Sequence, residues 1–418
     1  MEKKPRNIWY ISKYAANPFF DDPGRQFFFA KYMAKSNRDL TLISSRSSAG
    51  FKIPSLGMKN QIYYEFDGVK GVLLNGPIIN PGFNLKRVYS WAVFELRLLY
   101  WALLKRKQRP NVIIVSSLSI LTFLTGVLLK RYFKCKLICE VRDIWPLTII
   151  ETKNWKNSNL FIKFLAYVER IGYKYADAIV GTMPNLKEHV AIINPLYASK
   201  VAFIPTGFDP DYWGNDITPD DENSFADVFR KIPDDHFIVG YSGTIGLVNC
   251  VCQIVDAAAI LKGKPISFLI LGNGVLKDEL ENKVKNLGLK NVHFLDPVPK
   301  KKVSRFLEKC HLLLNPWKGG DKIYRYGVSP NKWIDYMYSA RPIIVSLDGF
   351  PSIINEAGCG VFIKADDVAD LAKTIEEFYC MDRKKLDQMG AAGKAYLLNN
   401  LTYERLTEKY LKIIDDLN

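Results

Sequence analysis

The sequence predicts an α/β protein built from two doubly wound, Rossmann-like domains, and three observations carry this prediction. Short apolar runs typical of buried strands alternate with helical stretches along most of the 418 residues. That order favours parallel sheets covered by helices on both faces. The chain is also too long for one ordinary core, since domains cluster near ~100–200 residues. An acidic, Pro-containing stretch over residues 206–235 interrupts the alternation, as a linker does.

The first domain is expected over residues 1–205. Its predicted strands are short apolar runs, at 8–11, 40–43, 62–66, 72–74, 112–115, 136–141, 178–180 and 201–204. Its predicted helices lie at 26–35, in the aromatic stretch 88–104, after residue 117 and at about 160–176. Residues 112–129 carry no charge. They divide into a strand and a helix, so we expect them in the core and not across a membrane.

The second domain is expected over residues 206–385, and C-terminal helices are expected over 386–418. The predicted strands of this domain lie at 237–241, 267–271, 292–295, 312–314 and 342–346. Its predicted helices lie at 249–261, 275–287, 301–308 and 331–338. Doubly wound sheets bind ligands at the carboxyl ends of their strands, so functional residues are expected in the loops that follow strands.

Positive charge is concentrated in the first domain. Residues 1–205 contain 31 Lys and Arg against 13 Asp and Glu, whereas the rest of the chain is slightly acidic. This asymmetry indicates a polyanionic partner, and the alternative is a basic surface with no partner. No basic-aromatic stacking platform or reading helix stands out, so we expect an anionic membrane and not nucleic acid.

The stretch 88–107 is the candidate membrane contact. It is apolar and aromatic as far as residue 104, includes Trp91 and Trp101, and ends in the basic run Lys105, Arg106 and Lys107. Two charged residues interrupt it, so it falls short of the ~20 apolar residues that a span needs. Two interpretations stay open: a helix in the membrane interface with its Trp rings among the headgroups, or a helix buried against the sheet.

The seven cysteines are odd in number and scattered, and no secretory signal precedes them. We therefore expect reduced thiols in a cytosolic protein. Cys250 and Cys252 lack a second Cys pair at ligand spacing, and the four histidines lie far away in the sequence. No metal site is expected.

Two glycine-rich turns follow predicted strands of the second domain. The first contains Gly243, Thr244 and Gly246 and precedes a predicted helix. Glycines there let the backbone approach a phosphate, and a helix N-terminus adds free N–H groups. The second turn contains Gly272 and Gly274. Each turn alone is equally compatible with an ordinary tight connection.

A third motif combines a helix start with a cation. Ser329 is a good N-cap, Pro330 suits the first helical position, and Asn331 follows. Lys332 then falls in the first turn, where the helix dipole disfavours a cation unless an anion is bound there. Asp335 lies one turn further on the same face, where a carboxylate can accept hydrogen bonds from ribose hydroxyls. The alternative is a capped surface helix with a weak Lys–Asp pair.

The first domain offers two smaller candidates. Gly24 and Arg25 end a loop at a predicted helix start, which makes them a candidate anion or acceptor site, or part of a flexible loop. Arg142 and Asp143 follow a predicted strand. They are placed to hold sugar hydroxyls or to orient each other, and the alternative is a plain salt bridge.

Taken together, these motifs resemble family-4 glycosyltransferases with the GT-B fold, in particular the subgroup of O-antigen and capsule amino-sugar transferases. The resemblance spans nearly the whole chain. It rests on the segments DPGRQ (22–26), IIVSS (113–117), EVRDIWP (140–146), PTGFD (205–209), YSGTIGL (241–247), LGNG (271–274) and SPNKWIDYM (329–337).

The resemblance implies a retaining, metal-independent transfer, without a cofactor, from a UDP-sugar to a polyprenyl-diphosphate-linked saccharide. The donor's base would lie near Val298, its diphosphate near Gly243, Gly246 and Lys332, and its ribose at Asp335. The basic first domain would bind the acceptor, with the protein held peripherally at the inner face of the plasma membrane. The last C-terminal helix would pack back on the first domain.

Three departures from the family pattern shape the expected mechanism. Asp335 stands where the family has Glu, and Gly327 stands where a paired-Glu motif has its first Glu. The basic residues that usually follow the first glycine-rich turn are also replaced by apolar ones. Lys332, Arg142 and Asp143 are therefore the catalytic candidates, in a front-face transfer. The alternatives are a nucleotide-sugar epimerase or hydrolase, and a non-catalytic membrane-associated binding protein on the same fold.

Overall fold

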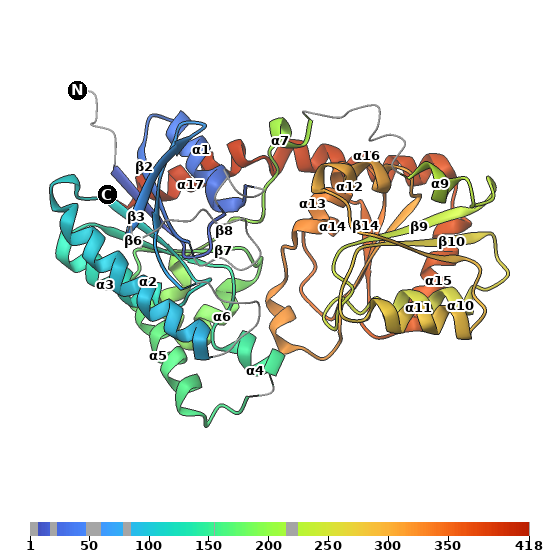
Figure 1. Cartoon of the computed structure of the whole chain (residues 1–418), viewed down its shortest axis with the longest axis horizontal. Helices are drawn as coiled ribbons and strands as arrows, with labels where there is room; N and C mark the ends of the chain where they lie inside the picture. Colours follow the sequence, from blue (N-terminus) through green and yellow to red (C-terminus); the bar gives the residue numbers. More distant parts are fainter. Residues whose placement is uncertain are drawn as a thin grey trace. The chain divides into compact units, whose positions relative to one another are not determined.

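The computed structural model describes residues 7–16, 23–46, 60–77, 85–153, 155–214 and 225–417 (Figure 1). Asp22 of the first family motif and part of the acidic linker, residues 215–224, lie outside the described residues. The chain divides into two compact units. The first unit contains Met1–Gly207 and Tyr403–Asn418, and the second contains Phe208–Thr402.

The first unit is built on an eight-stranded sheet in the order β3-β4-β2-β1-β5-β6-β7-β8. The strands are β1 (Asn7–Ile11), β2 (Asp39–Ser45), β3 (Gln61–Phe66), β4 (Val69–Leu74), β5 (Val112–Ser116), β6 (Lys136–Val141), β7 (Ala178–Gly181) and β8 (Val201–Phe203). Neighbouring strands are parallel except β3 and β4, which run antiparallel. Only Asp67 and Gly68 connect β3 to β4, too few residues for the crossover that a parallel pair needs.

Helices cover both faces of this sheet (Figure 1). They are α1 (Arg25–Lys35), α2 (Leu85–Leu104), α3 (Thr122–Phe133), α4 (Leu147–Lys153), α5 (Leu160–Tyr175), α6 (Leu186–Ile193) and α17 (Tyr403–Asp416), with 3-10 turns η1 (Arg106–Gln108) and η2 (Pro195–Lys200). Successive side chains of a strand point to opposite faces of the sheet. Trp9 contacts Trp101 of α2 at 4.7 Å between ring centroids, while the neighbouring Tyr10 donates to Glu140 on the other face.

The last helix belongs to the first unit, as the family resemblance implied. Tyr403 of α17 stacks on Phe28 of α1 at 4.8 Å between ring centroids. At the far end of α17, Arg38 donates to Asp415 over 2.9 Å. The buried aromatic contact supplies most of this packing, since exposed ion pairs contribute little.

The second unit contains a six-stranded parallel sheet in the order β11-β10-β9-β12-β13-β14. The strands are β9 (Phe237–Ser242), β10 (Ile266–Leu271), β11 (Val292–Leu295), β12 (Leu312–Pro316), β13 (Ile343–Ser346) and β14 (Gly360–Ile363). The chain adds strands on one side of β9 and then, from β12, on the other. In such a sheet the ligand crevice lies outside the carboxyl ends of β9 and β12, where the direction of winding reverses.

Two apolar clusters form the core of the second unit, one on each face of its sheet. The helices are α7 (Pro210–Gly214), α9 (Ala226–Phe229), α10 (Cys252–Ile260), α11 (Lys277–Asn286), α12 (Lys300–Glu308), α13 (Asn331–Tyr338), α14 (Ile353–Glu356), α15 (Val368–Tyr379) and α16 (Arg383–Asn400), with the 3-10 turn η3 (Lys322–Tyr326). Helices α10, α11 and α15 pack on one cluster. Helices α12, α13 and α16 pack on the other.

Along the described part of the chain, no helix is both long enough and apolar enough to cross a membrane. All seven cysteines are free thiols.

Candidate functional site

The carboxyl edge of the second unit's sheet gathers the residues predicted to bind a donor. They come from four separate loops, after β9 (Gly243, Thr244, Gly246), β10 (Gly272, Gly274), β11 (Val298) and β12 (Ser329, Pro330, Asn331, Lys332, Asp335). Because the sheet is parallel, strands that are far apart in sequence deliver these loops to one edge.

Lys332 and Gly243 meet at the centre of this edge. A Cβ atom built on Gly243 would lie 3.1 Å from the Lys332 ammonium nitrogen, and Gly243 has φ of 143°. The same nitrogen, Nζ, donates to the Tyr241 hydroxyl over 3.2 Å and to Asn249 Oδ1 over 3.3 Å. It also lies 4.5 Å from the centroid of the Tyr241 ring. The first turn of α13 and the turn after β9 thus enclose one ammonium group.

Burial strongly affects the charge of Lys332. It lowers the pKa of the ammonium group to about 8, and the nearby Asp335 carboxylate only partly opposes the shift. The hydrogen-bond acceptors around the ammonium group, Tyr241 and Asn249, are neutral. An anion bound beside the cation would therefore be stabilised by it and would restore its ordinary pKa.

The glycines after β9 and β10 allow two loops to pack closely at this edge. A Cβ atom on Gly272 would lie 1.9 Å from the carbonyl oxygen of Gly243, so only glycine lets the two loops pack. The Gly243 N–H donates to the Leu271 carbonyl over 3.0 Å, and the Ile245 N–H donates to the Asn273 carbonyl over 2.9 Å. The N–H groups of Gly243 and Ile245 are therefore engaged within the fold, and the approach of a phosphate to this turn stays a prediction. Gly243 contributes the space beside Lys332.

The helix that carries Lys332 covers the predicted residues 331–338, but its N-cap residue differs from the prediction. Pro330, and not Ser329, is the N-cap residue of α13, and it has no side-chain cap hydrogen bond. The first turn contains no acidic residue, so the positive end of the helix dipole adds to the charge of Lys332. Asp335 follows on the same helix, with Lys300 of α12 at 4.0 Å from its Oδ1. The helix expected from residue 249 begins later, at Cys252.

Three residues of this edge were not predicted. Tyr241 orients Lys332 and donates to the Thr244 carbonyl over 2.8 Å. Asn249 bridges Lys332 and the same carbonyl, with its Nδ2 donating over 3.0 Å. Tyr336 accepts from the Ser242 N–H over 3.0 Å and fixes the end of β9. Tyr241 and Tyr336 carried a local signal, because they lie inside the segments YSGTIGL and SPNKWIDYM, whereas Asn249 lies in neither.

Arg25 does not have the acceptor role predicted for it. Its side chain is buried, and its Nε donates to Glu140 Oε1 over 3.0 Å. The other guanidinium nitrogens donate to the carbonyl oxygens of Pro205 and, over 2.9 Å, Ile204. Its guanidinium also lies over the Phe29 ring, 4.5 Å from the centroid. The buried pair stabilises the junction of α1, β6 and the segment after β8. Gly24 beside it is the N-cap residue of α1.

Arg142 and Asp143 follow β6 at the carboxyl edge of the first unit's sheet. Their N–H groups donate to the Ser117 hydroxyl oxygen over 2.9 and 3.2 Å. That hydroxyl donates to the Asp143 carbonyl oxygen over 3.1 Å. Burial raises the pKa of the Asp143 carboxyl, and Arg142 and Arg87 oppose the shift. The catalytic roles of Arg142 and Asp143 stay predictions.

Residues 88–104 belong to α2, and the structure buries one face of this helix. Trp91 and Trp101 are 0% and 2% exposed, so they cannot be the rings that contact a membrane. Trp91 donates to the Tyr14 hydroxyl over 2.8 Å, and Trp101 packs on Trp9. The membrane assignment of these two side chains is wrong because the sheet buries this face of α2. Of the basic run that follows, Lys105 is half-buried, and Arg106 and Lys107 are exposed.

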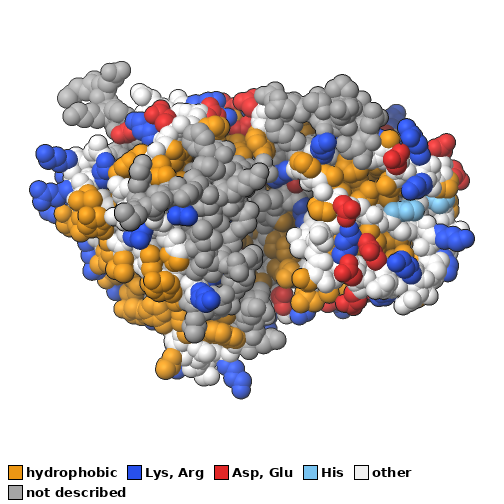
Figure 2. Space-filling view, in the orientation of Figure 1, with side chains coloured by type: hydrophobic (Ala, Val, Ile, Leu, Met, Phe, Trp, Pro, Cys, Tyr) orange, Lys and Arg blue, Asp and Glu red, His pale blue; other side chains and the backbone are white. Residues whose placement is uncertain are grey.

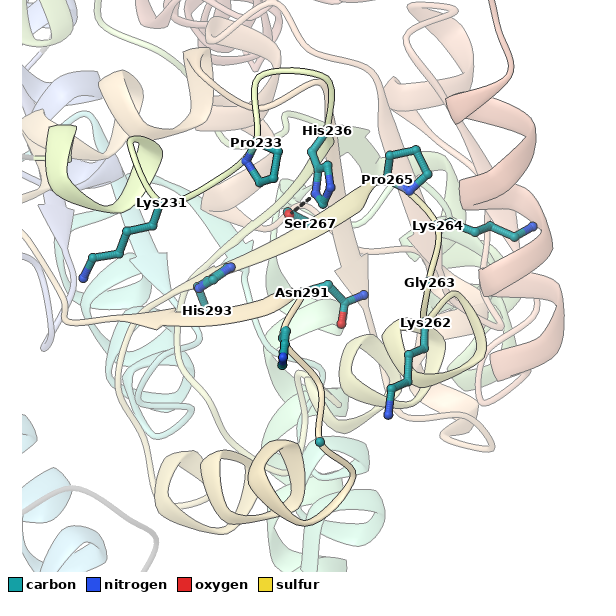
Figure 3. Close-up of a pocket in the computed structure, with 12 residues that line it drawn as sticks. Lys231, Pro233, His236, Lys262, Gly263, Lys264, Pro265, Ser267, Asn291 and His293 are labelled. Carbon is teal, nitrogen blue, oxygen red and sulfur yellow. Dashed lines mark hydrogen bonds between the residues drawn. The ribbon is translucent and has the colours of Figure 1, made fainter.

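A separate pocket of about 740 Å³ lies at the opposite, amino-terminal edge of the second unit's sheet (Figure 3). Its lining includes His236, which precedes β9 and contacts Ser267 over 2.8 Å, and His293 of β11. None of the predicted donor residues lines it. Within the described residues no group of three or more His, Cys, Asp or Glu is placed to hold a metal ion; metal independence of the reaction stays a prediction.

Comparisons with known proteins agree with this arrangement. Residues 224–396 match the sequence model of the family described as "Glycosyl transferases group 1". "Probable glycosyltransferase WbjE" of Pseudomonas aeruginosa is 21% identical over 342 residues, which are 79% of this chain and 81% of that protein. WcaI of Escherichia coli, whose name assigns it to colanic acid biosynthesis, is 30% identical over 162 residues, 37% of this chain and 38% of WcaI.

Solved structures extend the likeness to the whole fold. Sucrose-phosphate synthase from Thermosynechococcus elongatus has a TM-score of 0.74 at 14% identity, covering 99% of both chains. Anabaena HepE in complex with UDP and glucose has a TM-score of 0.67 at 12% identity, covering 98% of this chain and 100% of HepE. Residues 224–396 therefore match the glycosyl transferases group 1 family, and the chain has the GT-B fold.

Proposed function

We propose that this protein is a glycosyltransferase that moves a sugar from a UDP-sugar to a lipid-linked saccharide in the biosynthesis of a cell-surface polysaccharide. The observation that carries the donor assignment is the Lys332 ammonium group, enclosed above Gly243 at the first turn of α13. A cation enclosed at a helix N-terminus would suit a phosphate-bearing leaving group. HepE, similar in fold, has been solved with UDP and glucose. WcaI, similar in sequence, supports a polysaccharide pathway.

The proposed reaction is a retaining, front-face transfer without a metal ion. Negative charge develops on the diphosphate as the bond to the sugar breaks, and Lys332 and the α13 dipole would stabilise it. The departing phosphate would accept the proton of the attacking hydroxyl. Asp335 would hold the ribose, with the Lys300 ammonium group 4.0 Å from its Oδ1. Val298, after β11, would lie by the base.

Transfer assays with Lys332→Met test this function. The variant removes the cation but keeps an apolar side chain of similar length, so the protein should stay folded. We expect transfer to fall by at least about a hundredfold, as happens when a group that stabilises transition-state charge is lost. Lys285→Met, which changes an exposed lysine of α11, is the matched control. Turnover of the Lys332 variant near that of the control would remove Lys332 from the mechanism.

The same assay separates the alternatives. Incubation with the donor alone would yield a free or isomerised sugar from a hydrolase or an epimerase, whereas a transferase needs the acceptor for turnover. Full activity in the presence of a chelator is expected for a metal-independent enzyme. Absence of UDP binding would favour a non-catalytic binding protein.

We further propose that the protein associates peripherally with the anionic inner face of the plasma membrane, through a surface other than Trp91 and Trp101. Helices α2, α3 and α5 carry exposed apolar side chains in stripes at helical spacing. We call this surface the apolar face; it consists of Tyr89, Leu96, Tyr100, Leu128, Tyr132, Phe164 and Tyr167. Figure 2 shows hydrophobic side chains gathered over these helices. Leu96 is 68% exposed and Tyr100 is 60% exposed, so both side chains lie on the surface and not at the edge of the hydrophobic core.

The charge around the apolar face fits an anionic lipid surface. Residues 85–175 contain seventeen Lys and Arg but only five Asp and Glu. None of the five acidic side chains is exposed: Glu95, Glu140 and Glu169 are buried, and Asp143 and Glu151 are half-buried. An apolar face surrounded by cations, with its carboxylates turned inward, combines lipid burial with attraction to anionic headgroups.

Vesicle sedimentation tests this surface. The triple variant Leu96→Ser, Tyr100→Ser, Tyr167→Ser should bind phosphatidylglycerol-rich vesicles at least about tenfold more weakly, since each apolar side chain contributes about 1–2 kcal/mol when buried. Wild-type binding should also weaken as salt rises. The control carries Val275→Ser and Leu287→Ser, exposed apolar residues of the second unit. Equal vesicle binding by the triple variant and the control would exclude the apolar face.

A further inference from the structure

The pocket at the amino-terminal edge of the second unit's sheet is basic. It has a volume of about 740 Å³, within the range of about 300–1,000 Å³ typical of small-molecule sites, and the loops before β9, β10 and β11 contribute to it (Figure 3). The described residues that line it include four lysines and two histidines but no Asp or Glu. Within the described part of the chain, Lys264 pairs with Glu376, and the other three lysines form no ion pair. Positive charge is therefore concentrated at this pocket.

The inner wall of the pocket is polar and held in place by the sheet. Ser267 of β10 is 2% exposed, and its Oγ lies 2.8 Å from His236 Nδ1. His293 of the neighbouring strand β11 is half-buried, and its ring makes no hydrogen bond to any residue that the structure describes. In Figure 3 these three side chains lie between Lys231 on one side and Lys262 on the other. Imidazole rings can donate hydrogen bonds, so this wall offers polar contacts to a bound anion.

The loop before β10 reaches the turn between α11 and β11. The Lys262 ammonium group donates to the Leu287 carbonyl over 3.0 Å, and a Cβ atom built on Gly288 would lie 3.7 Å from its nitrogen. Lys290 follows on the same turn and is exposed. A carbonyl group carries no net charge, so this contact does not neutralise Lys262. Ammonium groups from two separate loops therefore line one side of the pocket.

The protonation of His293 reflects this concentration of positive charge. Burial lowers its pKa, and repulsion from Lys231 and His236 lowers it further. Asp234 and Asp235, in the loop before His236, are exposed and are not among the described residues that line the pocket. An anion bound beside His293 would oppose the repulsion and raise this pKa. The pocket thus favours an anionic ligand over a neutral one.

A phosphate group on a polar carrier matches the pocket in charge and size. A phosphate monoester carries about −1.5 to −2 charge at pH 7 and three acceptor oxygens, so several separate N–H donors can bind it at once. The volume of about 740 Å³ leaves room for a sugar-sized carrier beside the phosphate. Asn291 also lines the pocket, and its Oδ1 has no hydrogen-bond partner among the described residues. This amide can therefore accept a hydrogen bond from a hydroxyl group of the carrier.

We propose that this pocket binds a phosphorylated sugar, with Lys262, Lys290 and the two histidines contacting its phosphate and Asn291 contacting its hydroxyl groups. The pocket lies at the opposite edge of the sheet from Lys332, and none of the predicted donor residues lines it. The inference therefore goes beyond the proposed function, because this ligand binds at a place separate from the donor site.

Calorimetric titration at low ionic strength with ribose 5-phosphate, inorganic phosphate and ribose tests the site directly. Wild-type protein should bind ribose 5-phosphate at least about tenfold more tightly than ribose, since ribose lacks the charged group. The double variant Lys262→Met, Lys290→Met and the single variant His293→Gln should each bind ribose 5-phosphate at least about tenfold more weakly than wild type. The matched control is Lys187→Met, Lys285→Met, which removes the same charge at exposed lysines outside the pocket.

Nuclear magnetic resonance of the histidine rings gives a readout that a general loss of surface charge would not produce. The chain contains four histidines, of which two line the pocket. Ribose 5-phosphate should raise the pKa of His293 and shift the ring resonances of His236. The rings of His189 and His311, which are not among the pocket's described lining residues, should not respond. Binding that leaves the His236 and His293 rings unchanged would place the ligand elsewhere and overturn the proposal.

The remaining outcomes separate this pocket from the donor site. Lys332→Met should bind ribose 5-phosphate as wild type does; loss of binding in that variant alone would assign the ligand to the donor site. Unchanged affinity in the folded double variant, or failure of both ribose 5-phosphate and inorganic phosphate to bind, would also overturn the proposal. Thermal unfolding establishes that each variant is folded, and His293→Gln provides a second test if the double variant is not. Normal UDP binding without ribose 5-phosphate binding would remove this pocket and leave the proposed function standing.

Discussion

The pH dependence of UDP binding provides the sharpest test of the donor site. In the free protein burial lowers the pKa of Lys332 to about 8 from its ordinary 10.5. A bound diphosphate would restore the ordinary value, so the folded, free state is the one that loses its proton first. The affinity for UDP should therefore be highest well below pH 8 and should fall as pH rises through 8, because only the protonated form of Lys332 binds the anion well.

The magnitude follows from the same pKa. At pH 7 about nine-tenths of Lys332 is protonated, and at pH 9 about one-tenth, so UDP should bind about tenfold more weakly at pH 9. Lys332→Met should bind about 10–100-fold more weakly at pH 7, the equivalent of about 1.5–3 kcal/mol for a charge-assisted hydrogen bond. This variant should also show no such dependence between pH 7 and 9.

Isothermal calorimetry with UDP at pH 7, 8 and 9 measures both effects, and Lys285→Met serves as the control. The reasoning is refuted if wild-type affinity is the same at pH 7 and pH 9. It is also refuted if the Lys332 variant keeps the wild-type pH dependence, because another group would then be titrating.

Three further predictions follow from packing. Gly243→Ala should weaken UDP binding and cost about 1–3 kcal/mol of stability, because its φ is 143° and the new methyl would press on the neighbouring ammonium group; calorimetry and urea unfolding measure the two effects. Arg25→Met should destabilise the first unit by about 3–5 kcal/mol, because it leaves the Glu140 carboxylate buried and unpaired, and wild-type stability would contradict the ion-pair role. Trp101→Ala should cost about 3–5 kcal/mol in chemical unfolding, as expected for a side chain 2% exposed and not for a membrane-facing ring.

The glycine motifs illustrate how far local sequence reaches. Their position after strands was predictable because β9 and β10 are apolar and bounded by glycine. The use of their N–H groups was not, since Gly243 donates to Leu271, on the neighbouring strand. A hydrogen bond between strands depends on the order of the sheet, which the sequence pattern leaves open.

Arg25 shows the same limit for charged residues. A basic residue at a helix start suggests an anion site, yet its partners Glu140 and Pro205 lie more than a hundred residues away in the sequence. Lys13 carries no motif, yet it is buried, and Arg87 and Glu95 of α2 act on its charge. Burial and long-range partners decide whether a cation serves the fold or a ligand.

What the sequence alone determined was the alternation of strands and helices, the division into two α/β parts and the excess of basic residues in the first. Those properties depend on the order of apolar and polar residues and on composition, which are local. The tertiary structure decided which face of α2 is buried and which cations lie beside each other. Those outcomes depend on contacts between strands and helices that are distant in sequence, so only the assembled sheets could place Lys332 over Gly243 and turn Trp91 and Trp101 into the core.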